Sequence, residues 1–201
     1  MGTWSKAAAG ALVAVSVTWA AIPSAATAVT VPLSCNKGPD GQVCKVHVTI
    51  PSSVEEGATF KVRIDGNNSG KISHTGLKYI YNMTTELRIP DNASYVAGSA
   101  KVIPDTGSPN ARPGARVTQS GRTIALVLPA HIEDGQDYTP PSFEFELKAT
   151  GTAGSRIVQK FQQYRLTANA IIIGDVHTVC NPTPKPYSIG TTNITAAAPA
   201  P

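Results

Sequence analysis

The chain has 201 residues, and 17 Lys and Arg against 13 Asp and Glu give it a formal net charge of +4. Its basic residues are scattered along the sequence rather than clustered, which argues against a nucleic-acid-binding surface. Aromatic residues make up only 6% of the chain. A folded core must therefore be built mainly from Val, Ile, Leu and Ala side chains.

The N-terminal residues have the features of a secretory signal. Lys6 precedes an apolar run over residues 7–21, and Ala26 and Ala28 have the spacing of a small-residue cleavage site. The run is short for a membrane span, and no second apolar segment follows. We expect cleavage after Ala28, one domain over residues 29–195, a disordered Ala/Pro tail over residues 196–201, and a product that is secreted or held at the cell surface.

The first half of the domain is predicted to consist of short strands separated by turns. Apolar and polar residues alternate in it, as is typical of strands with one buried face. In one such strand Phe60, Val62 and Ile64 are expected to face the core. The strands expected in this half cover residues 29–33, 43–50, 58–65, 76–81, 84–89 and 95–102.

The second half continues the pattern, most clearly where Phe143, Phe145, Leu147 and Ala149 alternate with charged residues. Two segments rich in Pro, Gly and Asp, 104–114 and 129–141, are predicted to be loops. Strands are expected at residues 116–119, 123–128, 142–150, 156–173, 176–180 and 187–194. Many half-buried strands without a helical period predict an all-β fold, an antiparallel β-sandwich of about eight to ten strands.

The cysteines are Cys35, Cys44 and Cys180. Export to an oxidising compartment predicts one disulfide and one remaining thiol. Cys35 would face Cys44 if the turn at residues 37–41 closes a hairpin. Pairing of Cys35 with Cys180 would instead tie the first strand to the last, and the larger loop favours it slightly in the chain-entropy model. Cys44 is then unpaired, but it stays open as the alternative partner of Cys35.

Several segments resemble known bacterial families. The stretches LRIPDNASYVAGSAKV and SGRTIALVLPAHIEDGQDYTPPSFEFELKATGTAG are similar to Ig-like repeat domains of bacterial surface proteins. The stretches VPLSCNKGPDGQ and VTIPSSVEEGATFKVRI resemble secreted actinobacterial proteins of uncharacterised function. Together they cover most of the domain. The resemblance implies an Ig-like β-sandwich outside the cell and brings no catalytic residues with it.

The sharpest local motif runs from Asp65 to Ser73. Asp65, Asn67 and Ser69 stand at positions 1, 3 and 5 of a calcium-binding loop, whose oxygen ligands converge on a hard cation. Position 12 is Gly76, so the bidentate carboxylate is missing. The alternative, which we favour, is a polar turn in which Gly and Asn supply the required backbone conformations.

Other chemical motifs are weaker. Cys44 and His47, and likewise His177 and Cys180, have zinc-ligand spacing, but residues three apart on a strand point to opposite faces. His131 lies beside acidic residues with no nucleophile nearby in sequence. We therefore expect neither a metal nor a cofactor.

Two carboxylates, Glu144 and Glu146, share one strand face as a glycosidase pair would, but alternating charges also suit an exposed strand. The sequence thus predicts a non-catalytic module that acts in binding or structure at the cell envelope or outside the cell, through loops 104–114 and 129–141. The alternative is a carrier that holds an apolar envelope molecule, such as a lipid, between the sheets. Neither the partner nor the oligomeric state is predicted.

Overall fold

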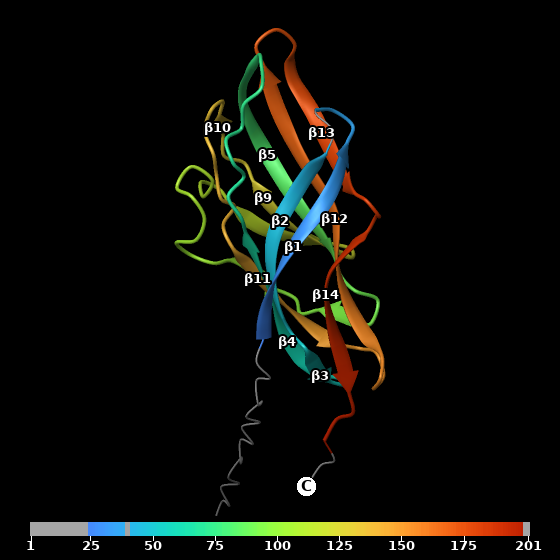
Figure 1. Cartoon of the computed structure of the whole chain (residues 1–201). Coiled ribbons are helices and arrows are strands. Elements are labelled where there is room, and N and C mark those ends of the chain that lie inside the picture. Colours follow the sequence, from blue (N-terminus) through green and yellow to red (C-terminus); the bar gives the residue numbers. More distant parts are fainter. Residues whose placement is uncertain (1–23, 39–40, 199–201) are drawn as a thin grey trace, which may run out of the picture.

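The computed structural model describes residues 24–38 and 41–198, and this part of the chain is all-β (Figure 1). No helix long and apolar enough to cross a membrane occurs in these ranges. Four of the fourteen strands are only two or three residues long. The strands are β1 (Ser24–Cys35), β2 (Gln42–Pro51), β3 (Ser53–Glu55), β4 (Thr59–Gly66), β5 (Leu77–Arg88), β6 (Ala93–Tyr95), β7 (Lys101–Val102), β8 (Arg116–Ser120), β9 (Thr123–Leu128), β10 (Ile132–Glu133), β11 (Phe143–Ala149), β12 (Arg156–Ala170), β13 (Gly174–Pro182) and β14 (Tyr187–Thr195).

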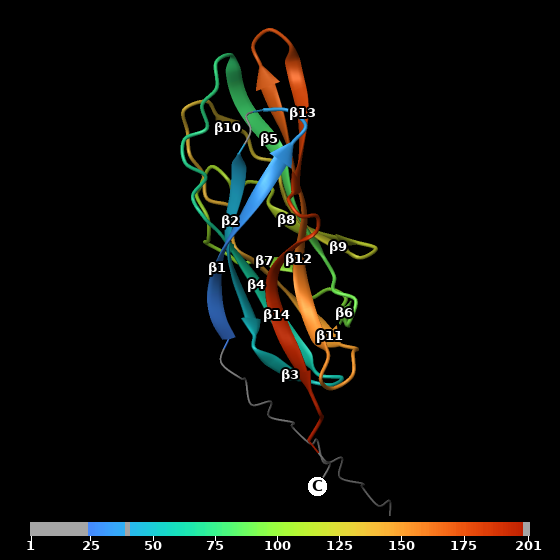
Figure 2. The ribbon, with the colours of Figure 1, turned by 45° about the vertical axis from the view of Figure 1, so that its right-hand side comes forward.

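The strands form one hydrogen-bonded path that folds back on itself into two layers. The order is β6-β11-β4-β2-β1-β13-β12-β5-β9-β8, and every described pair is antiparallel except β14 with β3. Strands up to β1 form one layer and strands from β13 onward form the other (Figures 1 and 2). This confirms the predicted antiparallel β-sandwich.

Along the strand path the two layers are joined where β1 meets β13, and β3, which follows β2, makes a second connection by pairing with β14. The register pairs Leu33 with Pro182 and Cys35 with Cys180, and a disulfide links the two cysteines. This is the pairing that the sequence favoured slightly. Cys44 keeps a free thiol.

The core lies between the layers and follows the predicted alternation. Phe143, Phe145 and Leu147 of β11 are at most 1% exposed, and the expected residues of β4 are buried beside them. The opposite layer supplies Ile124, Leu126 and Leu128 of β9, together with residues of β5 and β12. One aliphatic-rich cluster results, as the low aromatic content requires.

Strand β5 corrects one expectation. Residues 76–81 and 84–89 were predicted to be two strands, but β5 is continuous from Leu77 to Arg88. Asn82 has a positive φ of 49°, and the pairing with β12 shifts register beside it. This extra residue is a β-bulge, so Ile80 and Met83 both face the core although they are three apart. The break in alternation is therefore a bulge rather than a strand end.

The chain ends bear on the predicted boundaries. Residues 1–23 of the expected leader lie outside the described part, whereas residues 24–28 belong to β1 and pair with residues 47–51 of β2. Cleavage after Ala28 would leave that part of β2 at the edge of the layer. Of the expected tail, residues 196–198 have no regular structure and 199–201 lie outside the described part.

Breaking the disulfide should strongly destabilise the sandwich. In the chain-entropy model, replacing both Cys35 and Cys180 with Ser lowers the free energy of unfolding by roughly 4–5 kcal/mol, because their separation of 145 residues is large. Urea unfolding without reductant measures the change. Cys44→Ala is the matched control and should cost about 1 kcal/mol. Equal stability of the double variant and this control would contradict the expectation.

Candidate binding surface

One end of the molecule exposes three consecutive isoleucines. Strands β12 and β13 are joined there by Ile171, Ile172 and Ile173, which are 61%, 92% and 74% exposed. We call these three residues the isoleucine tip. It lies at the upper end of the molecule in Figure 1, whereas the start of β1 and the end of β14 lie toward the lower end.

The geometry of the turn does not require isoleucine. Gly174, with a positive φ of 72°, supplies the unusual conformation, and Ala170 pairs with Gly174 to close the hairpin. The Ile171 amide also donates to the Gly76 carbonyl at 2.8 Å, which fastens the turn to the start of β5. Turns ordinarily use Gly, Asn, Asp or Pro, and β-branched residues prefer strands. Local folding therefore gives no reason for the three exposed side chains.

Behind the tip lies a polar and aromatic surface that we call the outer face. Residues paired between antiparallel strands project to the same side of a sheet. The register aligns Tyr79 with Asn169 and Asp175, and it aligns Tyr81 with Thr167 and His177. The outer face consists of these six side chains, contributed by β5, β12 and β13, and Thr167 is the one among them that is buried, at 5% exposed.

Asp175 is the centre of the hydrogen bonding on the outer face. Its carboxylate accepts from Asn169 Nδ2 and from Tyr81 Oη, each at 2.7 Å. The bond from Asn169, followed by that from Tyr81, lowers the pKa of Asp175. The same bond to Asp175 raises the pKa of Tyr81. Asp175 thus stays ionised while it braces β12, β13 and β5 just below the tip.

An aromatic cluster extends the outer face. The His131 ring stacks on Tyr79 with centroids 4.5 Å apart and lies 5.1 Å from the ring of Tyr81. His131 immediately precedes β10, which pairs with β5. The histidine that the sequence placed beside two acids therefore lies flat on a tyrosine ring.

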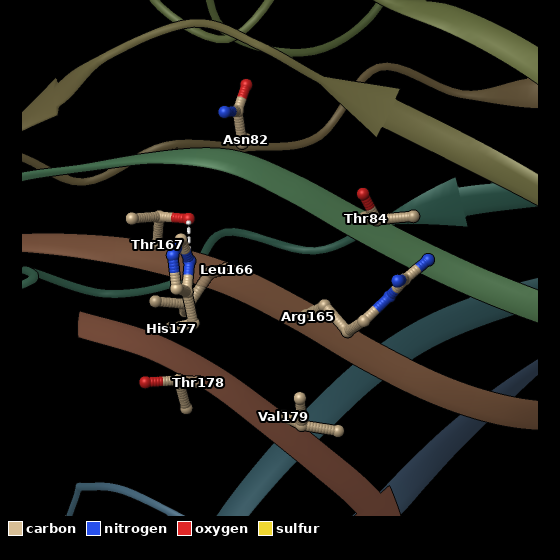
Figure 3. A pocket seen from close by; sticks show the side chains of 8 residues that line it. All are labelled: Asn82, Thr84, Arg165, Leu166, Thr167, His177, Thr178 and Val179. Atoms are coloured by element: carbon tan, nitrogen blue, oxygen red, sulfur yellow. Dashed lines mark hydrogen bonds between the residues drawn. The ribbon is translucent and has the colours of Figure 1, made fainter. Parts of the chain in front are cut away.

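The bulge at Asn82 borders a groove of about 320 Å³ (Figure 3). Thr167 lies at the groove with its hydroxyl 3.1 Å from His177 Nδ1, and Arg165 forms an ion pair with Glu86. The lining residues are Asn82, Thr84, Arg165, Leu166, Thr167, His177, Thr178 and Val179. Their hydroxyl, amide, imidazole and guanidinium groups suit the groove to hydrogen bonding with a partner.

The loops that the sequence proposed for binding pack against each other. The Ser108 amide donates to the Thr139 carbonyl at 2.9 Å, and Asn110 Nδ2 donates to the Asp137 carbonyl at 3.0 Å. A side chain at Gly107 would place its Cβ 2.6 Å from the Pro141 nitrogen. Much of the polar capacity of loops 104–114 and 129–141 is therefore used within the protein.

The calcium-like segment is held in internal contacts. Asp65 forms an ion pair with Arg63 at 2.8 Å. Although burial opposes it, the hydrogen bond from Arg63 lowers the pKa of Asp65. Asn68 accepts from the Gly70 amide at 2.7 Å and donates to Asp137 at 2.6 Å. The favoured hairpin turn is not formed: residues 67–74 have no regular structure, and β4 and β5 do not pair with each other. The segment instead runs beside loop 129–141, where the Ser69 amide donates to the Tyr138 carbonyl at 2.8 Å.

Other candidate residues are also engaged elsewhere. Cys180 is in the disulfide, so it cannot join His177 at a zinc ion. Glu144 Oε1 lies 3.2 Å from both Lys61 Nζ and Lys101 Nζ. Burial opposes ionisation, but these hydrogen bonds lower the pKa of Glu144, whereas a glycosidase acid needs a raised pKa. Within the described ranges, no three His, Cys, Asp or Glu side chains gather as a metal site.

Cys44 is partly buried near a pair of tyrosines, of which Tyr138 is buried and Tyr164 is partly buried. Tyr138 and Tyr164 share a hydrogen bond of 2.9 Å between their hydroxyls. Burial raises the pKa of Cys44 to about 11 and that of Tyr138 to about 12. The thiol is thus protonated at neutral pH, which leaves little of the nucleophilic thiolate.

The isoleucine tip was missed by the sequence prediction. A strand was expected over residues 156–173, but β12 ends at Ala170. The signal lay in the residues themselves: three successive isoleucines break the alternation just before Gly174-Asp175. In a strand with one buried face, every second residue points to solvent, so three successive isoleucines cannot all face the core. Next to a turn, such a run indicates an exposed apolar surface.

The fold is similar to solved bacterial surface proteins at low identity. A putative membrane anchored protein from Corynebacterium diphtheriae aligns with 88% of this chain at 13% identity and a TM-score of 0.46, and the chain spans 38% of its length. A collagen-binding domain from a Staphylococcus aureus adhesin aligns with 83% of this chain and 99% of its own at 10% identity and a TM-score of 0.36. The collagen-binding domain of Erysipelothrix rhusiopathiae surface protein RspB aligns with 86% of this chain and 60% of its own, also at 10% identity, with a TM-score of 0.38.

No protein-family model matches the chain, and no curated protein matches it. The three TM-scores lie below 0.5, so the alignments assign neither a ligand nor an activity. The resemblance to secreted actinobacterial proteins stays a prediction from the sequence motifs.

The hydrogen bonds to Asp175 can be tested by titration. Tyr81→Phe should raise the pKa of Asp175 toward its usual value, and Asn169→Ala should raise it further, because each removes a donor. A lowered carboxyl pKa stabilises the folded hairpin above the unfolded pKa, and this contribution is lost as pH falls through the folded pKa. NMR titration of the carboxyl carbon measures these shifts. Tyr79→Phe is the control, and equal pKa values in all variants would contradict the geometry.

Proposed function

We propose that this protein is an exported, non-catalytic binding module that contacts its partner through the isoleucine tip and the adjoining outer face. The observation that carries the proposal is the exposure of Ile172, 92%, between neighbours that are 61% and 74% exposed. Soluble proteins bury large aliphatic side chains, and a contiguous exposed apolar patch marks an interaction surface. Binding would remove this surface from water.

The place of the tip in the fold supports the proposal. The start of β1 and the end of β14 lie away from it, so neither end of the folded domain covers the tip (Figure 1). The tip is also held rather than loose. It is fastened to β5 by the Ile171 amide and braced by Asp175 below it. A partner would meet a preorganised surface, which lowers the entropic cost of binding.

The outer face would fix the orientation of the bound partner. Apolar burial is non-directional, whereas hydrogen bonds fix orientation. The partly buried tyrosines Tyr79 and Tyr81 and the polar groove at Asn82 offer such groups beside the tip. The tip would thus supply most of the binding free energy and the outer face the specificity.

A location outside the cytoplasm is part of the proposal and is supported by the disulfide between Cys35 and Cys180. A non-catalytic role is supported by the contacts of the candidate catalytic groups. Glu144 is held by two lysines and His131 is stacked on Tyr79, so neither is set up for acid–base chemistry.

A lipid carrier needs a cavity between the layers. A groove at β1, β2 and β14, lined in part by Val48, Ile50 and Ile189, has a volume of about 150 Å³. Ligand pockets for small molecules begin at about 300 Å³. A side chain at Gly190 would lie 2.6 Å from Ile50, which shows how closely β14 approaches β2 there. This groove is therefore too small for the carrier role.

Replacing the isoleucines tests the proposal. The exported protein would be mixed with the complete envelope fraction of the producing cells, and the bound share measured after sedimentation. Replacing Ile171, Ile172 and Ile173 together with Ser should reduce binding at least about tenfold, because three apolar side chains no longer leave water.

The matched control is Val43→Ser, since Val43, at the start of β2, is another large aliphatic residue and is 50% exposed. This variant should bind as the unaltered protein does. Equal retention of the triple variant would show that the tip is not the contact surface.

A further inference from the structure

We infer that the isoleucine tip binds a lipid bilayer surface, with residues 171–173 inserted at the boundary between headgroups and acyl chains. The inference rests on the proposed function, because it names the partner of the same tip. Three observations support it: the shape of the tip, the level of the aromatic residues behind it, and the charges around it.

The tip is narrow and convex. A hairpin turn with three exposed side chains offers only on the order of a few hundred Å², below the roughly 600–800 Å² that each partner contributes to a specific, stable protein interface. Two convex tips of neighbouring copies would bury even less of each other. A bilayer sets no such minimum area, because its fluid surface closes around whatever side chains enter it.

The aromatic residues lie at the level that an inserted tip requires. Tyr79 pairs with Asn169, two residues before Ile171, and Tyr81 pairs with Thr167, four residues before it. At the rise of a β-strand these tyrosines lie about 7 Å and about 13 Å behind the start of the tip. Interfacial segments bury their apolar side by roughly 5–10 Å, and tyrosine favours the headgroup level. Insertion of the tip would thus bring both rings to that level.

Charged groups limit the depth of insertion. Asp175 lies level with Tyr79 and is kept ionised by its two hydrogen bonds. Lys78, exposed on β5, lies at nearly the same level, and the neighbouring loops add Lys71 and Asp134. Because both signs occur, the surface has no strong attraction to anionic lipid. Apolar insertion would therefore drive binding, with little dependence on salt or lipid charge.

A tryptophan reporter tests the inference at the tip itself. The chain has two tryptophans, Trp4 and Trp19, both in the expected leader. In exported protein carrying Trp4→Phe and Trp19→Phe, Ile172→Trp leaves the only tryptophan at the tip. Protein-free vesicles of phosphatidylcholine, with and without three-tenths phosphatidylglycerol, should shift its emission to shorter wavelength, and lipids brominated on their acyl chains should quench it.

Thr118→Trp in the same background is the matched control, because Thr118 is exposed on the edge strand β8. Its emission should not change. Flotation of the chain with Ser at all three tip positions should fall at least about tenfold relative to the unaltered chain. Unchanged emission from Ile172→Trp with both vesicle types would overturn the inference, as would binding that requires phosphatidylglycerol and disappears at high salt.

The outcomes separate the two proposals. Suppose that vesicles leave the reporter unchanged, but the triple variant still loses binding to the complete envelope fraction. The partner is then a protein or glycan, and the lipid inference fails while the proposed function stands. A reporter that shifts without vesicles as protein concentration rises would identify a second copy as the occupant and also overturn the lipid inference. If the triple variant binds both vesicles and envelopes normally, both proposals fail.

Discussion

The short seam between β1 and β13 is the constraint on which the fold depends. Three residue pairs and the Cys35–Cys180 disulfide join the two halves of a single strand path at that point. The path turns there, so the apolar face of one half comes to lie on the apolar face of the other. Hydrophobic burial then stabilises both layers, and the covalent link keeps the reversal closed in an oxidising environment.

The seam also determines what can extend beyond the sandwich. Strand β12 pairs along its first part with β14 and along its second part with β13, while β5 accompanies it on the other side. The second part carries the isoleucine tip at the end of a paired, three-stranded ribbon. At the tip no second layer covers the apolar side chains, so they stay exposed. In the rest of the described part, Val43 is the one other large apolar side chain that is exposed.

The fold was largely predictable because strand alternation reports burial directly. Residues of β4, β9 and β11 face the core as their pattern indicated, and the preferred cysteine pair is the one in the structure. The pattern failed where an extra residue changes the parity, as at Asn82, and where an apolar run continues into a turn, as at Ile172. The candidate surface depends on both places. The candidate surface also requires a particular register of β5, β12 and β13, because this register brings Tyr81, Asn169 and Asp175 together. That register could not be predicted from the alternation of apolar and polar residues in a single sequence.

The most direct test of the central claim is the solvent exposure of the isoleucine methyl groups in solution. A soluble nitroxide added to methyl-labelled protein should broaden the NMR signals of Ile171, Ile172 and Ile173 strongly. It should leave Ile157, which is 2% exposed, nearly unchanged. Tip methyl groups as protected as that of Ile157 would contradict the account, because the three side chains would then already be buried by the protein itself.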